Sequence, residues 1–336
     1  MGDYLLFIPL VLAFFISLFF TPLWIRKARS IGLIWKDMHK KKEKRVSGSG
    51  GIVVLLAFVI AVLSFVAYRN FFLSSSAHLV EILSLLTTVL LVGGIGLIDD
   101  LFGWQRGGLP MKARLILVAL TSIPLMAINA GRSQISLPLI GITDIGLIYP
   151  LILIPLGIMG ATTTFNFLAG YNGLEAGEGI LILSALGLVA FLLGHSWLSL
   201  IAFCMVLSLI GFLFYNFSPA KVFPGDVLTY SVGSLIAIIP ILGNFERIAV
   251  FFFIPIIIET ILKSRGKLQK QSFSELNEDG SLRLKYNKIY SLNHLAIFLI
   301  NRFNIKATEK RVVYSVWAFQ ILVILAGLFI FRRGIF

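Results

Sequence analysis

Long uncharged apolar stretches alternate with short charged segments along the whole chain. A membrane-spanning helix needs about 20 consecutive apolar residues, and most of these stretches reach that length. The stretch from Gly179 to Ala220 is too long for one crossing, and Gly194-His195-Ser196 is its natural break. The pattern predicts ten spans, at 4–25, 48–68, 80–98, 114–131, 146–165, 179–193, 197–215, 227–243, 247–262 and 312–331.

The composition excludes other classes of protein. Hydrophobic residues make up 58% of the chain and charged residues 13%, against about 25% charged in an ordinary soluble domain. Cys204 is the only cysteine, so a scaffold held by internal disulfides is also excluded. We therefore predict an all-α polytopic integral membrane protein that forms a single domain over residues 1–336.

The basic residues predict how the chain is oriented in the membrane. Lys and Arg gather in the connections that stay on the cytoplasmic side, and here nine lie in 26–45 and eleven in 263–311. Both termini are then extracytoplasmic. The net charge of +13 becomes a property of the cytoplasmic face, where it attracts anionic headgroups or an anionic substrate rather than nucleic acid. The predicted cytoplasmic loops are 26–47, 99–113, 166–178, 216–226 and 263–311.

Two of these loops have features of their own. In the last loop, Glu278-Asp-Gly280 predicts a small β-hairpin, and Ser291 is expected to cap a helix over 292–303 that lies at the membrane interface. In the first loop, the basic run Lys36–Arg45 is interpreted mainly as a positive-inside anchor.

Three polar motifs carry the candidate chemistry, and all fall at predicted cytoplasmic helix ends. An ionisable side chain at hydrocarbon depth costs about 2.5–3.5 kcal/mol, so each needs a partner or a task. The first motif is the adjacent pair Asp99-Asp100, followed by Lys112. Two neighbouring carboxylates stay ionised when a cation or a metal-bound phosphate is close. The alternative interpretation is a pair of solvated acids at a helix end.

The second motif, from Asn166 to Gly179, holds four glycines, two asparagines and two glutamates. Glycines allow a close backbone approach to a ligand, although a flexible turn would have a similar composition. The third motif, Phe223-Pro-Gly-Asp226, places a carboxylate at the start of a helix. Helix capping explains that position, yet a capping Asp can still spare an oxygen for a metal.

Taken together and in this order, the motifs resemble those of the polyprenyl-phosphate N-acetylhexosamine-1-phosphate transferases. The likeness covers nearly the whole chain and includes the glycine patch Ser47-Gly-Ser-Gly-Gly-Ile52 that opens the second span. The family has ten helices and both termini outside, in agreement with the charge count. The wording Asn172-Gly-Leu-Glu-Ala-Gly177 resembles the N-acetylglucosamine-1-phosphate transferases that act on dolichyl phosphate, and the last loop looks archaeal. An archaeal origin implies that the protein lies in the cell membrane.

The resemblance implies a role for each matching residue. Asn166 and Asp226 match ligands of Mg²⁺, with Mn²⁺ as an alternative ion. The acidic pair and Lys112 match catalytic positions. The positions that match substrate-binding residues are Gly170, Asn172, Glu175, Phe223, Arg265, Lys267 and His294. For His294, an interfacial hydrogen-bonding role is the alternative.

The expected partners are UDP-N-acetylglucosamine, a polyprenyl or dolichyl phosphate and membrane lipid, and the resemblance also suggests a homodimer. The last loop has only His294 where the muramoyl-pentapeptide branch carries a histidine cluster, which argues against that branch. A relative's acidic residue before the glycine patch is replaced here by Val46-Ser47, which puts one nucleotide contact in doubt.

The predicted reaction transfers N-acetylglucosamine-1-phosphate to the lipid and releases UMP, which starts lipid-linked oligosaccharide synthesis for N-glycosylation. The same chemistry on undecaprenyl phosphate for a cell-envelope glycan is one alternative. A secondary transporter of an anionic substrate is another, but carriers place their polar groups near mid-membrane and often have repeated halves. A non-catalytic scaffold is the third.

Overall fold

The computed structural model describes residues 6–137 and 141–335, so residues 4 and 5 of the first predicted span lie outside it. Eight helical segments of the described residues are long and apolar enough to cross a membrane, and each overlaps a predicted span. They are α1 (Ile8–Ser30), α2 (Gly51–Phe72), α3 (Leu79–Arg106), the segment Tyr149–Leu168 that contains α6 (Ile154–Phe165), α7 (Leu174–Leu192), α8 (Ser196–Asn216), α9 (Gly225–Gly243) and α13 (Glu309–Ile330).

The two other predicted spans are interrupted helices. Residues 114–131 fall on α4 (Met111–Leu120) and α5 (Ile123–Ala127), and residues 247–262 fall on α10 (Glu246–Phe252) and α11 (Ile254–Arg265). Pro124 and Pro255 lie in the first turn of the second helix of each pair. Proline lacks the amide hydrogen that would continue the preceding helix, so the apolar pattern persists while the helix does not.

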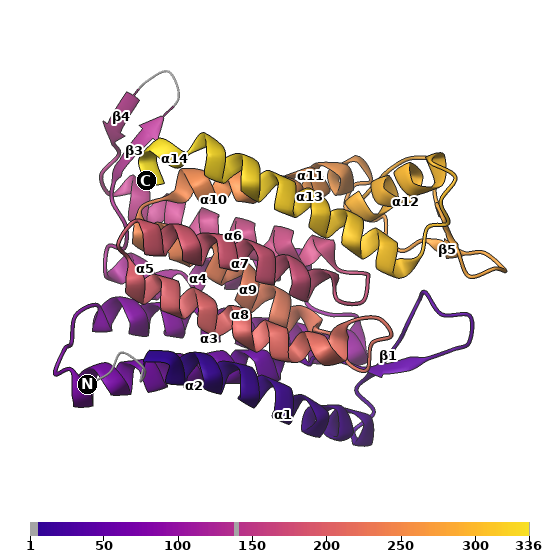
Figure 1. Ribbon diagram of the computed structural model, residues 1–336, viewed down its shortest axis with the longest axis horizontal. Helices are drawn as coiled ribbons and strands as arrows, with labels where there is room; N and C mark the ends of the chain where they lie inside the picture. Colours follow the sequence, from indigo (N-terminus) through magenta and orange to yellow (C-terminus); the bar gives the residue numbers. More distant parts are fainter. Residues whose placement is uncertain (1–5, 138–140, 336) are drawn as a thin grey trace.

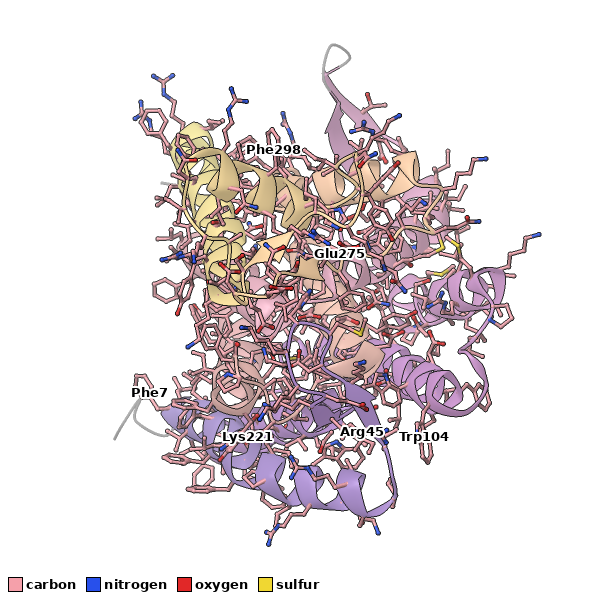
Figure 2. All side chains as sticks on the ribbon, turned by 90° about the vertical axis from the view of Figure 1, so that its right-hand side faces the viewer. Phe7, Arg45, Trp104, Lys221, Glu275 and Phe298 are labelled. Carbon is pink, nitrogen blue, oxygen red and sulfur yellow. The ribbon has the colours of Figure 1, made fainter. Side chains whose placement is uncertain are left out.

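The helices run side by side along the long axis of the molecule (Figure 1). At one end lie β1 (Ile34–Lys36), which pairs with β2 (Arg45–Ser47), together with β5 (Glu275–Leu276), its partner β6 (Leu282–Arg283), and α12 (Leu292–Arg302). At the other end lie β3 (Gln134–Leu137), β4 (Gly141–Asp144) and α14 (Arg332–Ile335). Figure 2 looks onto the first end, where Arg45, Lys221 and Glu275 are labelled. The membrane side that each end faces stays a prediction from the charges.

The last loop has the local structure that its sequence suggests. β5 and β6 are antiparallel on either side of the turn that contains Asp279, and the Ser281 backbone N–H donates to Asp279 Oδ1 at 2.9 Å. Ser291 caps α12, since its hydroxyl accepts a hydrogen bond from the His294 N–H at 3.1 Å. The placement of α12 at a membrane interface stays a prediction.

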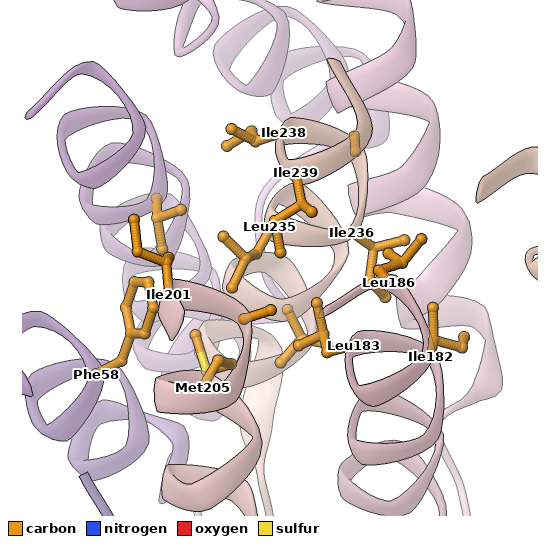
Figure 3. Close-up of a cluster of buried hydrophobic side chains, with 14 of the residues drawn as sticks. Phe58, Ile182, Leu183, Leu186, Ile201, Met205, Leu235, Ile236, Ile238 and Ile239 are labelled. Atoms are coloured by element: carbon orange, nitrogen blue, oxygen red, sulfur yellow. The ribbon is translucent and has the colours of Figure 1, made fainter. Parts of the chain in front are cut away.

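The core lies among α7, α8 and α9, where aliphatic side chains from all three helices meet (Figure 3). Leu183 from α7, Met205 from α8 and Leu235 from α9 are all fully buried. α9 is the central helix, and every residue from Val227 to Ile241 is buried. A helix that is buried on all sides lies inside the bundle. Contacts with neighbouring helices therefore fix the position of its first turn.

Gly96 allows α3 to approach the start of α9 closely. A Cβ atom on Gly96 would lie 2.5 Å from the Asp226 carbonyl oxygen, whereas a Cβ on Gly94 would have no neighbour within 4 Å. We expect Gly96→Ala to lower the free energy of unfolding by about 1–3 kcal/mol, because the clash is with backbone atoms. Gly94→Ala is the matched control and should unfold at the wild-type temperature or slightly above. Thermal unfolding in detergent checks this, and equal transitions for both variants would contradict the close approach.

Candidate active site

The three polar motifs meet at one cavity of about 210 Å³ at the end of the bundle that carries β1 and β5. Its lining brings together seven residues expected at the site from sequence. They are Asp100, Asn166, Gly170, Asn172, Glu175, Phe223 and Asp226. A second cavity of about 230 Å³ shares Trp35, Asp100 and Asp226 with the first and adds Asp99. The two cavities therefore adjoin at the acidic residues.

Asp100 fixes the start of α9. The backbone N–H of Asp226 donates to Asp100 Oδ1 at 2.7 Å, and that of Val227 lies 3.4 Å from Oδ2. The first amides of a helix have no partner within it, so a carboxylate from α3 serves as the cap. Asp226 makes no capping bond with its own side chain, and its carboxylate is 27% exposed. Asp226 therefore lies in the first turn of α9, where its charge is favourable, but its side chain makes no cap hydrogen bond.

Asp99 is held by an arginine that the sequence interpretation missed. Arg114 Nη1 lies 3.0 Å from Asp99 Oδ2 and 3.9 Å from Asp226 Oδ2. The Leu109 N–H also donates to Asp99 Oδ1 at 2.6 Å. Lys112, the predicted cation, is exposed and has no polar contact among the described residues. Both basic residues lie on α4, but only Arg114 faces the acidic pair.

Asn166 joins the acidic side of the cavity through Thr229. The Thr229 hydroxyl lies 3.1 Å from Asn166 Oδ1 and 3.3 Å from the Asp226 carbonyl oxygen. Carboxylate and amide oxygens are ligands that Mg²⁺ accepts, and Mg²⁺ commonly uses one or two carboxylates plus substrate phosphates. Within the described residues no three His, Cys, Asp or Glu side chains form a metal cluster. Asn166 and Asp226 thus have the ligand chemistry that a magnesium ion would need, with substrate and water able to supply its other ligands.

The glycine-rich motif and the Phe223 turn form the other side of the cavity. Gly170 has φ +147°, a conformation that favours glycine, and its N–H lies 3.3 Å from Glu175 Oε1. The Phe223 backbone N–H donates to the Ser47 carbonyl at 2.7 Å, and its carbonyl accepts from Gly50 N at 2.9 Å. The glycine patch at the start of α2 therefore fixes the backbone of Phe223, whose side chain lines the cavity beside Asn172.

Residues 82–244, from α3 to the end of α9, match the model of glycosyl transferase family 4. A putative UDP-N-acetylglucosamine–dolichyl-phosphate N-acetylglucosaminephosphotransferase from Saccharolobus solfataricus is 32% identical over 318 residues, covering 93% of this chain and 92% of that protein. The chain belongs to glycosyl transferase family 4.

Other relatives are named for the same substrates or for different ones. The UDP-N-acetylglucosamine–dolichyl-phosphate N-acetylglucosaminephosphotransferase of Dictyostelium discoideum is 28% identical over 65% of this chain and 62% of that protein. A phospho-N-acetylmuramoyl-pentapeptide-transferase from Halalkalibacterium halodurans is 29% identical over 80% and 86%. Together with the apolar helices, these relatives make this family 4 member an integral membrane sugar-phosphate transferase.

The first loop lies outside the segment that matches the family 4 model, yet it completes the cavity. Trp35, Lys36, Asp37 and Met38 line it, so the segment that the charges predict as an anchor to the membrane also forms part of the site. The signal that could have revealed this was Asp37, an acid at the start of a basic run.

His39 docks this loop onto the glycine-rich motif. Its ring stacks on Tyr171 with centroids 4.3 Å apart, and the Ser274 N–H lies 3.4 Å from Nε2. Burial lowers the pKa of His39, and the nearby carboxylates of Glu309 and Asp37 oppose this shift. A neutral imidazole fits an Nε2 that accepts a hydrogen bond from a backbone amide.

Three residues predicted to bind substrate do not line either cavity of the family 4 site. Arg265 and Lys267 are exposed at and after the end of α11. His294 is fully buried, with Tyr290 N 3.4 Å from Nδ1 and the Phe273 carbonyl 3.3 Å from Nε2. Burial lowers the pKa of His294, and an Nδ1 that faces a backbone N–H while Nε2 faces a carbonyl suits a neutral ring. Its substrate contact stays a prediction, and in the structure His294 contacts the backbone of Phe273, which does line the cavity.

Proposed function

We propose that this transferase moves N-acetylglucosamine-1-phosphate from UDP-N-acetylglucosamine to a dolichyl-type polyprenyl phosphate and releases UMP. The product would start lipid-linked oligosaccharide synthesis for N-glycosylation. The observation that carries the proposal is the single cavity in which Asn166 and Asp226 meet Asn172 and Phe223, beside the Asp99–Arg114 pair. We also propose that this cavity faces the cytoplasm, because the most basic loops lie at the same end.

In this mechanism an oxygen of the lipid phosphate attacks the β-phosphorus of the sugar nucleotide. A new P–O bond forms, the bond from the β-phosphorus to the bridging oxygen breaks, and UMP leaves with that oxygen. Phosphoryl transfer depends mostly on positioning and on charge stabilisation. Bound Mg²⁺, held by Asn166 and Asp226, would offset the negative charge of the pyrophosphate.

The chain's own charged groups have distinct tasks in this scheme. Asp100 is committed to the start of α9 and orients Asp226, so it acts through position rather than by taking a proton. Arg114 supplies a guanidinium between Asp99 and Asp226, where it can bind a phosphate oxygen. Phe223 offers an aromatic face for the nucleobase, and Asn172 offers an amide.

An apolar groove supports a lipid acceptor. A hollow of about 330 Å³ lies among α6, α9, α10 and α11, and its lining includes Gly160, Thr164 and Ile257. Thr164 lies two residues before Asn166 on the same continuous helical segment, so one end of the groove lies at the level of Asn166 along that segment. A prenyl chain has the chemistry that such a surface accepts.

The decisive experiment measures UMP release by the purified protein in detergent with UDP-N-acetylglucosamine. Dolichyl phosphate, undecaprenyl phosphate and no lipid are compared, each with Mg²⁺ and with chelator. The proposal expects UMP only with lipid and Mg²⁺, and faster with dolichyl phosphate. Preference for undecaprenyl phosphate would favour a cell-envelope glycan instead. Absence of UMP with every lipid would overturn the proposal, and uptake of intact sugar nucleotide into proteoliposomes would favour a carrier.

Gly160 offers a separate test of the lipid groove. A Cβ on Gly160 would have no neighbour within 4 Å, so a larger side chain fits without a backbone clash. We expect Gly160→Leu to raise KM for the lipid about tenfold, because it displaces roughly two methylene groups of the prenyl chain from the groove. KM for the sugar nucleotide should stay unchanged.

The matched control for this test is Gly94→Leu, which also points into open space but lies outside the groove. Initial rates at varied lipid in mixed micelles give both KM values. Equal lipid KM values for the two variants would show that the prenyl chain lies elsewhere.

A further inference from the structure

Asn172 is held in place by groups from two distant parts of the chain. Its side-chain Nδ2 donates to Asp37 Oδ2 at 3.0 Å, across 135 positions in sequence. Its backbone N–H donates to Glu309 Oε1 at 3.2 Å. The first loop and the start of α13 therefore fix both the position and the side-chain orientation of one residue of the cavity.

The contact with Asp37 decides which way the amide of Asn172 faces. An ionised carboxylate only accepts hydrogen bonds, so the NH₂ group of the amide must be the part that faces it. Because the amide is planar, Oδ1 points away from Asp37. Among the described residues no donor reaches Asn172 Oδ1, although the residue is buried and lines the cavity. Asn172 thus presents a hydrogen-bond acceptor to whatever occupies the cavity.

Other contacts keep Asp37 in this role. The His39 N–H lies 3.3 Å from Asp37 Oδ1, and Lys40 Nζ lies 3.5 Å from Oδ2. Lys40 also forms an ion pair with Glu309, the residue that accepts from the Asn172 backbone. Every group that contacts the Asp37 carboxylate is a hydrogen-bond donor or a cation, so Asp37 acts as the acceptor in each of these contacts.

We propose that Asp37 is a positioning residue that makes the site select uracil over cytosine, by holding Asn172 Oδ1 toward the base. The inference rests on the proposed function, in which the donor is a uridine nucleotide. Uracil carries a donor, N3–H, on its base-pairing edge, whereas N3 of cytosine is an acceptor. Because the amide of Asn172 cannot flip, its Oδ1 accepts a hydrogen bond from N3–H of uracil but faces another acceptor, N3, in cytosine. A buried polar group without a hydrogen-bond partner costs binding free energy.

The test compares the binding of UDP and CDP to the purified full-length protein by titration calorimetry in detergent. Asp37→Asn removes the constraint, since an amide at position 37 can accept from or donate to Asn172. The double variant Asp37→Asn with Asn172→Asp exchanges the two groups, so that a carboxylate at 172 again presents only acceptors to the base. Glu43→Gln is the matched control, because Glu43 lies on the same loop, is exposed and has Arg45 as its one polar partner in the described part of the chain.

The wild type and Glu43→Gln are expected to bind UDP at least about tenfold more tightly than CDP, because mismatched buried groups are strongly penalised. For Asp37→Asn the preference should fall to about threefold or less, and the exchanged pair should restore it. An unchanged UDP-to-CDP ratio in Asp37→Asn would overturn the inference, as would a double variant without restored preference. A loss of affinity for both nucleotides in equal proportion would mean that Asp37 supports the fold only.

UMP release measured on the same preparations separates this inference from the proposed function. If the wild type turns over and the ratio does not depend on Asp37, only the inference fails. If the predicted ratios are found without any turnover, only the transferase proposal fails. If the wild type binds neither nucleotide, both fail.

Discussion

Asp226→Asn is expected to lower kcat about 1,000-fold, with little change in thermal stability. The carboxylate of Asp226 caps no helix amide, and its charged neighbours are Arg114, 3.9 Å away, and the carboxylates of Asp99 and Asp100. Asparagine keeps the shape of the side chain but loses the negative charge that a magnesium ion requires. The residual UMP release should no longer respond to added chelator.

The matched control is Asp279→Asn, the same change at an exposed turn of the last loop. Hydrogen bonds from Ser281 and Lys306 hold the pKa of Asp279 well below its usual range, and the residue lines neither cavity of the site. UMP release with Mg²⁺ from 0 to 10 mM, on the order of cellular levels and above, gives the comparison for both variants. Near-normal turnover of Asp226→Asn would show that this carboxylate takes no part in catalysis and serves only the local structure.

The sequence predicts the parts of the fold that depend on local pattern. The length of the apolar runs locates all eight long helices, since the side chains of a membrane-spanning helix pack inside the protein or face lipid along its whole length. It fails where one residue interrupts a helix inside an apolar run, as Pro124 and Pro255 do. The same apolar pattern locates the polar motifs, because Asp100, Asn166 and Asp226 are polar residues at the ends of apolar segments.

The sequence does not predict contacts between polar residues that lie within basic or polar stretches of the chain. Asp37 and Asn172 are 135 positions apart, and nothing local marks them as a pair. The sequence offers both a substrate contact and a hydrogen-bonding role for His294, because a lone histidine gives no sign of its neighbours, and the structure surrounds it with loop backbone. Such pairings depend on tertiary structure, so only coordinates reveal them.

The choice between Lys112 and Arg114 illustrates this limit. Both lie in the first turn and a half of α4, and helical geometry separates two residues that are two positions apart by about 200° around the axis. Only one of them can face Asp99, and the sequence does not say which. In the structure Arg114 meets both Asp99 and Asp226, while Lys112 is exposed.

Arg114→Gln is therefore expected to lower kcat/KM about 100- to 1,000-fold, whereas Lys112→Gln should stay within about twofold of the wild type. Without the guanidinium, Asp99 and Asp226 would face two anionic substrates with no protein cation between them, which raises the energy of the transition state more than that of the free enzyme. Because loss of a buried ion-pair partner can also destabilise the fold, Arg114→Lys is needed as a third variant.

Arg114→Lys keeps the charge but not the planar fork of donors, so it should recover part of the rate and unfold near the wild-type temperature. UMP release at varied lipid phosphate, measured beside thermal unfolding, separates lost chemistry from lost structure. A large loss of UMP release in Lys112→Gln, together with normal UMP release in Arg114→Gln, would show that Lys112 is the cation of the site. It would also mean that α4 turns about its axis when substrate binds, because the two side chains cannot face Asp99 at the same time.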